Sequence, residues 1–313
     1  MNAPSPNAKD RLTRAIHSLH GLSCGDAFGE RFFLAPEIAL SLIAQRAVPS
    51  RPWRYTDDTA MAIAITEILE EFGEIHQERL AQNFGERFLN DPHRGYGHAM
   101  HALLPELADH PKNWKRLSAQ LFKGAGSFGN GSTMRVAPIG AYFADDFDTL
   151  IQQAELSASV THSHAEGIAG AIAVALAAGL AWRNKASKLP ASRFLGEIYD
   201  RTPASEVRLG IAKALDLPEK TTIEVAAALL GNGAQVSAQD TVPFCLWVAA
   251  HHLDNYEEAL WTTVAGFGDR DTTCAIVGGI VVMSAGVESI PQGWMQARES
   301  IPVWFLHLGP ERV

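Results

Sequence analysis

Apolar side chains recur at intervals of three and four residues along most of the chain, and this helical period constrains the fold more than any other feature of the sequence. The segment that starts at Thr59 shows the pattern clearly, because its apolar residues fall on one face of an amphipathic helix. These residues are Met61, Ile65, Ile68, Leu69 and Phe72. The two-residue alternation of a half-buried strand is scarce, so the sequence predicts an all-α protein.

Two further segments predict helices in the interior. After Ala165, large apolar residues repeat at every fourth position from Ile168 to Leu180, and alanine and glycine on the other faces let neighbouring helices approach closely. After Thr273, residues 274–286 are apolar on every side, as expected for a central helix. The stretch 241–250 could form a buried strand, but its length and alanine content favour a helix.

Length and composition favour a single domain. The chain has 313 residues, 47% of them hydrophobic, which is enough to bury a sizeable core. We expect a disordered, proline-rich tail over residues 1–10 and one compact orthogonal multi-helix domain over residues 11–313. Residues 183–223 are richer in charge and proline, and we expect them to form peripheral helices or a lid.

Charge and cysteine content narrow the compartment and the partners. The formal net charge of −9 argues against a broad nucleic-acid surface but still allows one phosphate-bearing small ligand. The three cysteines form no CxxC pair and suit a reducing compartment. No apolar signal core follows the first residues, and the longest apolar run, residues 168–182, falls short of the roughly 20 residues that span a bilayer. We therefore expect a cytoplasmic protein without a membrane partner.

Two acidic segments, more than two hundred residues apart, each precede an apolar helix. Residues 55–59 read Tyr-Thr-Asp-Asp-Thr, and residues 268–273 read Gly-Asp-Arg-Asp-Thr-Thr. Carboxylate and hydroxyl oxygens in this number suit Mg²⁺, Mn²⁺ or Ca²⁺ and suit zinc poorly. The alternative is an ordinary helix cap, for which Asp and Thr are favoured. One acid would suffice for a cap, so two in each segment favour the metal site.

Two other segments carry polar groups ahead of helices. Residues 124–135 hold four glycines and small hydroxyl residues, and such a loop can bring backbone N–H groups against a diphosphate. The alternative is a plain glycine-rich turn. Residues 161–164 read Thr-His-Ser-His, where a capped helix start with one packed and one exposed histidine is favoured over a zinc site. A histidine that contacts phosphate or ribose is the intermediate interpretation.

With these segments in order, the chain resembles the ADP-ribosylglycohydrolase family. That family includes enzymes that remove ADP-ribose from arginine, enzymes that act on serine, and dinitrogenase reductase-activating glycohydrolase. The similarity runs from about residue 21 to residue 286 and rests on six stretches: GLSCGDAFGE, YTDDTAMA, DPHRGYG, GAGSFGNGSTMRVAPIG, THSHAEGIAGAIAVA and GDRDTTCAIVGGI.

The resemblance implies an all-α fold with two magnesium ions between helices, which manganese can replace. By this analogy the metal ligands are Thr56, Asp57, Asp58, Asp269, Asp271 and Thr272. The substrate-binding residues are Ser127, Phe128, Gly129, Asn130, Gly131, Met134 and His162. The catalytic residues are Glu30, Asp58 and Asp269.

The chain departs from the family pattern at three places. A glutamate that many members carry beyond the opening Gly-Asp falls at Phe33 in an ungapped alignment, and Glu30 stands nearby instead. Glu30 either takes over the metal-linked or water-activating role or is a surface residue. Arg270 lies between two expected ligands, and we expect its side chain to point to solvent. Residues 91–97 lack an acid that some members carry in their middle.

The function implied is magnesium-dependent hydrolysis of the glycosidic bond between ADP-ribose and a modified target. We expect that target to be a protein side chain, with arginine favoured. The alternatives are a non-catalytic binding or structural protein on the same fold, a magnesium-dependent phosphoesterase of a nucleotide diphosphate, and an enzyme that removes ADP-ribose from nucleic acid. The acidic balance disfavours the last of these.

Overall fold

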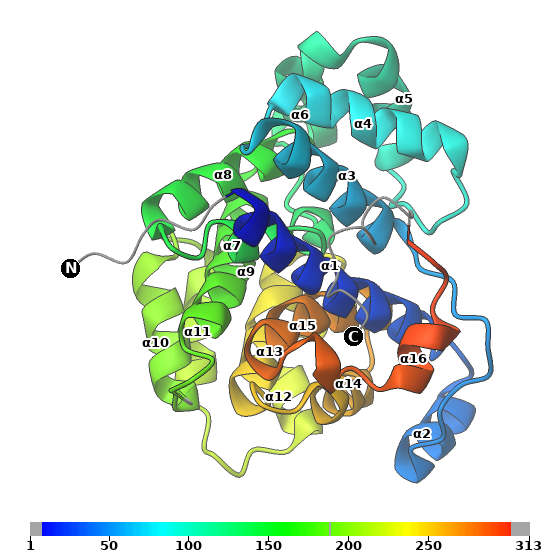
Figure 1. Ribbon diagram of the computed structural model, residues 1–313, viewed down its shortest axis with the longest axis vertical. Coiled ribbons are helices and arrows are strands. Elements are labelled where there is room, and N and C mark those ends of the chain that lie inside the picture. The colour runs from blue at the N-terminus through cyan, green and yellow to red at the C-terminus, as the bar shows by residue number, and fades with distance from the viewer. Residues whose placement is uncertain (1–7, 188, 302–313) are drawn as a thin grey trace.

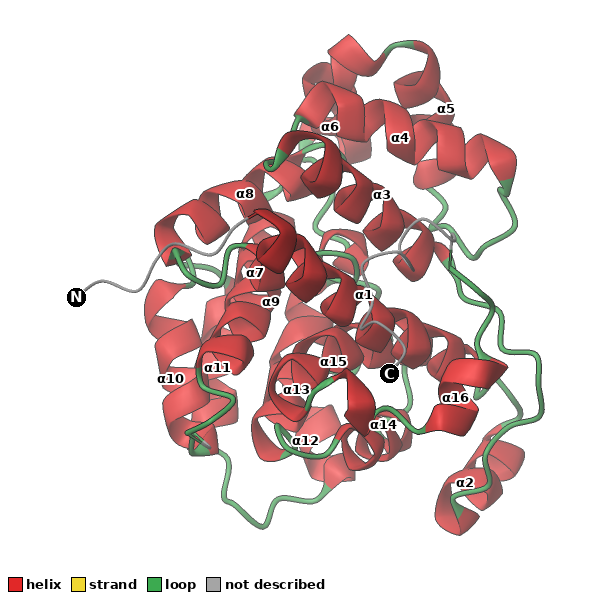
Figure 2. Cartoon of the chain, viewed as in Figure 1, coloured by secondary structure: helices red, strands yellow, loops and turns green. Residues whose placement is uncertain are grey.

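The computed structural model describes residues 8–187 and 189–301, and within these ranges the chain is helical (Figure 1). The described residues form sixteen α-helices and three short 3₁₀ helices, with two isolated β-bridges, Trp53–Arg298 and Gly129–Ser237, and no strand (Figure 2). The all-α prediction is confirmed. The helices pack around one contiguous apolar core, as expected of a compact multi-helix domain.

Six helices make up the centre of the molecule. They are α1 (Ala8–Glu30), α3 (Asp57–Phe72), α7 (Ala137–Tyr142), α9 (Ala165–Arg183), α13 (Ala238–His251) and α15 (Arg270–Ala285). The three segments that predicted helices from their apolar period became α3, α9 and α15, and residues 241–250 lie in α13. α9 is long and apolar enough to cross a membrane, yet 78% of its most apolar window is buried inside the protein.

The other helices surround this centre in three groups (Figure 1). One group is α4 (Gln77–Asn90), α5 (Met100–Asp109), the 3₁₀ helix Pro111–Asn113, α6 (Trp114–Gly124) and α8 (Phe147–Ser159). A second is α10 (Ala191–Arg201), α11 (Glu206–Asp216) and α12 (Ile223–Leu230). The third is α2 (Pro36–Gln45), α14 (Tyr256–Ala265), the 3₁₀ helix Val287–Ser289 and α16 (Gln292–Ala297). The remaining 3₁₀ helix, Asn130–Ser132, lies in the glycine-rich loop.

The backbones of α1 and α15 touch along a row of glycines. A Cβ added to Gly21, Gly25 or Gly29 would lie within 2.1 to 2.4 Å of a main-chain carbonyl oxygen of α15. These glycines are four residues apart, so they form one stripe of α1 that faces α15. The opening GLSCGDAFG sequence therefore allows the close contact, and the contact places the end of α1 beside the start of α15.

Two expectations need correction, one on where the first helix begins and one on the burial of the last residue of α3. The tail expected over residues 1–10 gives way to α1 at Ala8, while residues 1–7 lie outside the described part of the chain, as do residues 302–313 of the expected domain. Phe72 was expected on the buried face of its helix, but it is 41% exposed and stacks on His76 instead. It occupies the last residue of α3, where the helix leaves the core.

The glycine stripe gives a direct test. Gly25→Ala places a methyl group 2.1 Å from the carbonyl oxygen of Cys274, so the two helices must separate. We expect a loss of about 1–3 kcal/mol in the free energy of unfolding, measured by urea denaturation. Gly196→Ala in α10 is the matched control, because its methyl group meets nothing within 4 Å. That variant should keep or raise the stability by about 0.5–1 kcal/mol. Equal stabilities for the two variants would contradict the close contact.

Candidate functional site

The two acidic segments meet at the starts of α3 and α15. Asp57 and Asp58 begin α3, Asp269 precedes α15, and Asp271 lies in its first turn. Burial raises the pKa of Asp58 well above its ordinary value, and the charges of Asp26 and Asp271 raise it further. Burial raises the pKa of Asp271 in the same way, with Asp269 as the next cause. Segments more than two hundred residues apart thus share one electrostatic environment.

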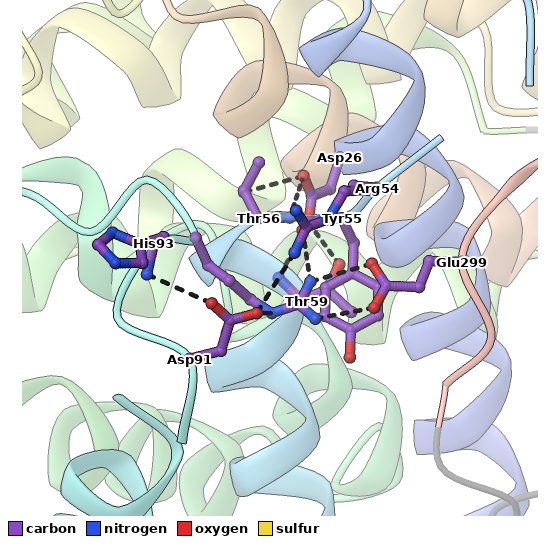
Figure 3. Close-up of polar contacts among 9 residues, drawn as sticks. Asp26, Arg54, Tyr55, Thr56, Thr59, Asp91, His93 and Glu299 are labelled. Atoms are coloured by element: carbon purple, nitrogen blue, oxygen red, sulfur yellow. Dashed lines mark hydrogen bonds and ion pairs between the residues drawn. The ribbon is translucent and has the colours of Figure 1, made fainter. Parts of the chain in front are cut away.

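Asp26 connects α1 to the start of α3 through hydrogen bonds (Figure 3). Its carboxylate is fully buried and accepts four hydrogen bonds, from the backbone N–H and the hydroxyl of both Thr56 and Thr59, at 2.5 to 3.1 Å. Burial raises the pKa of Asp26 to about 6, and these hydrogen bonds oppose the rise. Asp26 is not among the site residues that the sequence predicted. The available signal was a carboxylate inside the otherwise apolar stretch of residues 21–28.

Helix capping accounts for only one of the residues in the acidic segments. Thr56 is the N-cap of α3, and its hydroxyl accepts a hydrogen bond from the Asp58 N–H at 3.4 Å. Asp269 occupies the N-cap position of α15 but makes no capping hydrogen bond. Its carboxylate instead accepts a hydrogen bond from the Asn130 side-chain amide at 2.7 Å. Capping therefore does not account for these carboxylates, although the Thr56 hydroxyl oxygen lies 2.9 Å from Asp58 Oδ2 and the Thr272 N–H donates to Asp271 Oδ1 at 2.8 Å.

The donor set fits a hard divalent cation. Asp58 Oδ1 is buried without a hydrogen-bond partner, and an unpaired buried carboxylate oxygen is costly unless a cation or donor meets it. The charge of Arg135 acts to lower the pKa of Asp57, but its effect is smaller than those of burial and of the charges of Asp26 and Asp269, which raise it. Among the described residues, no three His, Cys, Asp or Glu side chains are grouped closely enough to hold a metal ion by themselves. An ion would therefore also draw on water and on threonine hydroxyls, such as that of Thr272.

The glycine-rich loop lies against this cluster. Asn130 links the two, because its side-chain amide donates to both Asp269 and Thr241. Within the described part of the chain, the backbone N–H groups of Ser127, Phe128 and Gly131 donate no hydrogen bond. Free N–H groups beside a carboxylate-bound cation could hold a diphosphate between them.

Space, not backbone conformation, limits the side chain at position 129. Gly129 has φ −58°, which any residue adopts, but an added Cβ would lie 3.2 Å from both His162 Nε2 and Ser127 Oγ. An added Cβ at Gly131 would lie 3.1 Å from the same His162 nitrogen. The loop and the imidazole therefore form one close-packed surface. Met134 was expected to lie near the ligand. Its side chain is only 4% exposed and packs in the apolar core, so Met134 supports the loop from below.

Two phenylalanine rings stand at the edge of the loop. Phe122 and Phe128 are 56% and 42% exposed, and their rings stack with centroids 6.4 Å apart. Phe122 and Lys123 hold positive φ angles of 50° and 61°, an uncommon conformation outside glycine. Exposed aromatic rings beside a candidate phosphate loop offer a stacking surface for a planar base.

The two histidines of residues 161–164 have separate roles. His164 is the N-cap of α9, and its Nδ1 accepts from the Glu166 N–H at 3.1 Å. His162 is buried, with Nδ1 2.7 Å from the Thr161 hydroxyl. Burial lowers the pKa of His162 to about 3, and Arg135 lowers it further, so the ring is neutral at physiological pH. The capped helix start with one packed histidine is confirmed, but the other histidine, His164, is half-buried and not exposed as expected.

Glu30 and Arg270 lie where α1 meets α15. Glu30 is an exposed residue at the end of α1. Partial burial of its carboxyl group raises its pKa, the charge of Arg31 opposes this rise, and the charge of Asp269 adds to it. Glu30 thus lies beside the acidic cluster. The expectation that Arg270 points to solvent is wrong. Arg270 is 7% exposed, donates to the carbonyl oxygen of Phe32, and lies over the rings of Phe33 and Phe267.

Residues 91–97 brace the start of α3 (Figure 3). The Arg94 carbonyl oxygen accepts from the Asp57 N–H at 2.8 Å. The Arg94 guanidinium pairs with Asp91 and Glu299 and lies 4.1 Å from the centre of the Tyr55 ring. This segment holds Asp57 in place through backbone geometry and supplies no acid of its own to the cluster.

Comparison with known proteins supports a common ancestry along the whole chain. The family model described as ADP-ribosylglycohydrolase matches residues 7–309. Similar curated proteins include "ADP-ribosylhydrolase ARH3" of Homo sapiens, 31% identical over 280 residues that cover 78% of this chain and 74% of that protein. The protein of the same name from Danio rerio is 28% identical over 93% of this chain and 87% of its own length. A solved "ADP-ribosylglycohydrolase-related protein complex" shares the fold, with TM-score 0.66, 21% identity and coverage of 96% of this chain and 95% of that chain.

The crowding of carboxylates predicts a stability effect with a definite sign. The raised pKa of Asp58 means that the folded state binds more protons than the unfolded state, so ion-free stability falls as pH rises above about 4. In chelator, Asp58→Asn should therefore raise the free energy of unfolding near pH 8 by roughly 1–3 kcal/mol, and should have little effect near pH 4. Asp200→Asn, at an exposed position on α10, is the control and should change little.

The same variant should respond differently to metal. Mg²⁺ should raise the melting temperature of the wild-type protein and raise that of Asp58→Asn much less, because a ligand stabilises only the state that binds it. A less stable Asp58→Asn variant in chelator near pH 8 would contradict the charge crowding.

Proposed function

Because the chain belongs to the ADP-ribosylglycohydrolase family and is a glycosidic-bond hydrolase, we propose that it releases ADP-ribose from a modified protein in a reaction that depends on two divalent cations, magnesium by preference. The observation that carries this proposal is the cluster of buried carboxylates at the starts of α3 and α15, joined to the glycine loop by the Asn130–Asp269 hydrogen bond. An anionic diphosphate can approach such a cluster only when cations neutralise it.

We assign the parts of the substrate to different elements. The carboxylates of Asp57, Asp58, Asp269 and Asp271, with the hydroxyls of Thr56 and Thr272, would hold the ions. Bound ions would polarise the ribose hydroxyls and acidify a water molecule. The free N–H groups of Ser127, Phe128 and Gly131 would bind the diphosphate, and the stacked rings of Phe122 and Phe128 would receive the adenine.

Glu30 is the proposed general base. It lies at the end of α1, next to the start of α15, and partial burial raises the pKa of its carboxyl group, which makes it a stronger base than an ordinary glutamate. It would take a proton from the water that attacks the anomeric carbon of the ribose. The bond from that carbon to the acceptor atom breaks, and the acceptor leaves with a proton. Asp58 and Asp269 are the alternative proton acceptors.

The charge of the protein supports arginine as the acceptor. The net charge is −9, and the exposed Glu30 carboxylate lies beside a cluster of further acids. A target that presents a guanidinium group would be attracted to this surface, whereas a nucleic acid would be repelled. We therefore propose an arginine-linked substrate first, with serine-linked and nucleobase-linked substrates as the comparison.

The decisive experiment is product analysis on a panel of arginine-, serine- and nucleobase-linked ADP-ribose substrates, with chelator and with added metal. We expect free ADP-ribose as the product, fastest release from arginine, no turnover after exhaustive chelation, and recovery with Mg²⁺ or Mn²⁺ but not zinc. AMP as the product would identify a phosphoesterase instead. Full turnover in chelator would refute the metal dependence, and faster release from another acceptor would refute the arginine preference.

Glu30→Gln separates a base from a metal ligand. If Glu30 activates water, the variant should bind Mg²⁺ and ADP-ribose as the wild-type protein does, while kcat falls by roughly 10²–10⁴-fold. If Glu30 binds metal, excess Mg²⁺ should restore part of the rate. The measurement is kcat across a Mg²⁺ titration, with Glu37→Gln on α2 as the control for loss of a nearby exposed acid. A wild-type rate at every Mg²⁺ concentration would remove Glu30 from the mechanism.

A further inference from the structure

Arg135 is a fully buried cation without a carboxylate partner among the described residues. Its guanidinium donates to the Thr161 hydroxyl at 2.8 Å and to the Ser157 carbonyl oxygen at 3.4 Å, and it lies 4.5 Å from the centre of the Phe84 ring. Burial lowers the pKa of Arg135 to about 9, against the charge of Asp57. Because an unpaired cation is costly to bury, a role beyond packing would explain its presence.

The Thr161 hydroxyl connects Arg135 to His162. A guanidinium has no acceptor atom, so the hydroxyl oxygen must accept the hydrogen bond from Arg135. The hydroxyl hydrogen is then free for His162 Nδ1, 2.7 Å away. In the reverse arrangement, Nδ1–H would donate to the hydroxyl and leave the buried hydroxyl hydrogen without an acceptor among the described residues. The contacts therefore favour an unprotonated Nδ1 and a proton on Nε2.

His162 Nε2 faces the glycine loop. Cβ atoms added to Gly129 and Gly131 would lie 3.2 and 3.1 Å from this nitrogen, so it borders the backbone that carries the free N–H groups. Within the described part of the chain, Nε2 makes no hydrogen bond of its own. It is therefore a donor that lies beside the proposed diphosphate site and has no partner there.

We infer that Arg135 and Thr161 are positioning residues, which hold His162 in its Nε2–H form so that it donates a hydrogen bond to the ligand at the glycine loop. This inference rests on the proposed binding of ADP-ribose at that loop. The buried guanidinium of Arg135 then has a structural role, because its fixed N–H donor determines the direction in which the Thr161 hydroxyl hydrogen points. The ring is then oriented before the ligand arrives, and no reorientation opposes binding.

The test begins with the ligand-free protein. Side-chain ¹⁵N NMR of the histidines, with His162 assigned through His162→Gln, reports which ring nitrogen carries the proton. We expect Nε2–H in the wild-type protein. Thr161→Val should lose the single form and show a mixture or Nδ1–H, while Thr161→Ser should restore Nε2–H because it restores the hydroxyl. An Nδ1–H ring in the wild-type protein, or an unchanged ring in Thr161→Val, would overturn the inference.

Calorimetric titration with ADP-ribose in the presence of Mg²⁺ completes the test. Thr161→Val should weaken binding roughly tenfold or more, the loss expected for one charge-assisted hydrogen bond, and Thr161→Ser should bind like the wild-type protein. Thr66→Val is the matched control, because Thr66 is equally buried and its hydroxyl donates to the Ala62 carbonyl oxygen of the same helix at 2.9 Å, its one hydrogen bond among the described residues. Equal affinities for Thr161→Val and Thr66→Val would overturn the inference.

Arg135→Met extends the test to the guanidinium. If the variant folds, its His162 ring should lose the single Nε2–H form as in Thr161→Val, since the Thr161 hydroxyl no longer has a fixed donor. If it does not fold, the Thr161 pair still decides the matter. A wild-type protein with an Nε2–H ring that fails to bind ADP-ribose would overturn the proposed function, a result that the NMR measurement distinguishes from failure of the tautomer assignment.

Discussion

The backbone contact between α1 and α15 fixes where every acid of the site lies. Only hydrogen atoms separate Gly21, Gly25 and Gly29 from the carbonyl groups of α15, so the two helices cannot slide or rotate without a clash. Asp26, on the neighbouring face of α1, then holds the start of α3 through four hydrogen bonds. One helix, α1, in this way positions the starts of α3 and α15, and the carboxylates that these two starts carry converge.

This convergence opposes stability in the ion-free protein. Burial and mutual repulsion raise the pKa values of Asp57, Asp58 and Asp271, and each raised pKa is a cost to the folded state above about pH 4. The surrounding core must compensate for that cost, and the glycine contact and the large apolar interior are suited to do so. Acids that destabilise their own fold are expected where a bound cation recovers the energy.

The glycine loop complements the acids with neutral donors. Its free N–H groups, the Asn130 amide and a neutral His162 add hydrogen-bond donors without adding positive charge. Under the proposed function, donors of this kind would select a diphosphate only where cations neutralise the nearby carboxylates, and ligand binding would then be coupled to metal binding. Arg135 contributes its charge from beneath the loop, where solvent cannot screen it.

The sequence by itself determined the helical class, because apolar period is a local property, and it located both acidic segments and the glycine loop. Residue spacing could not show that Asp26 would serve α3, or that Arg270 would turn inward to Phe32, since each contact joins segments far apart in the chain. The link from Arg135 through Thr161 to His162 likewise depends on how α9 packs beside the loop. Only the tertiary structure decided these contacts, because hydrogen bonds and burial depend on distances that local sequence does not set.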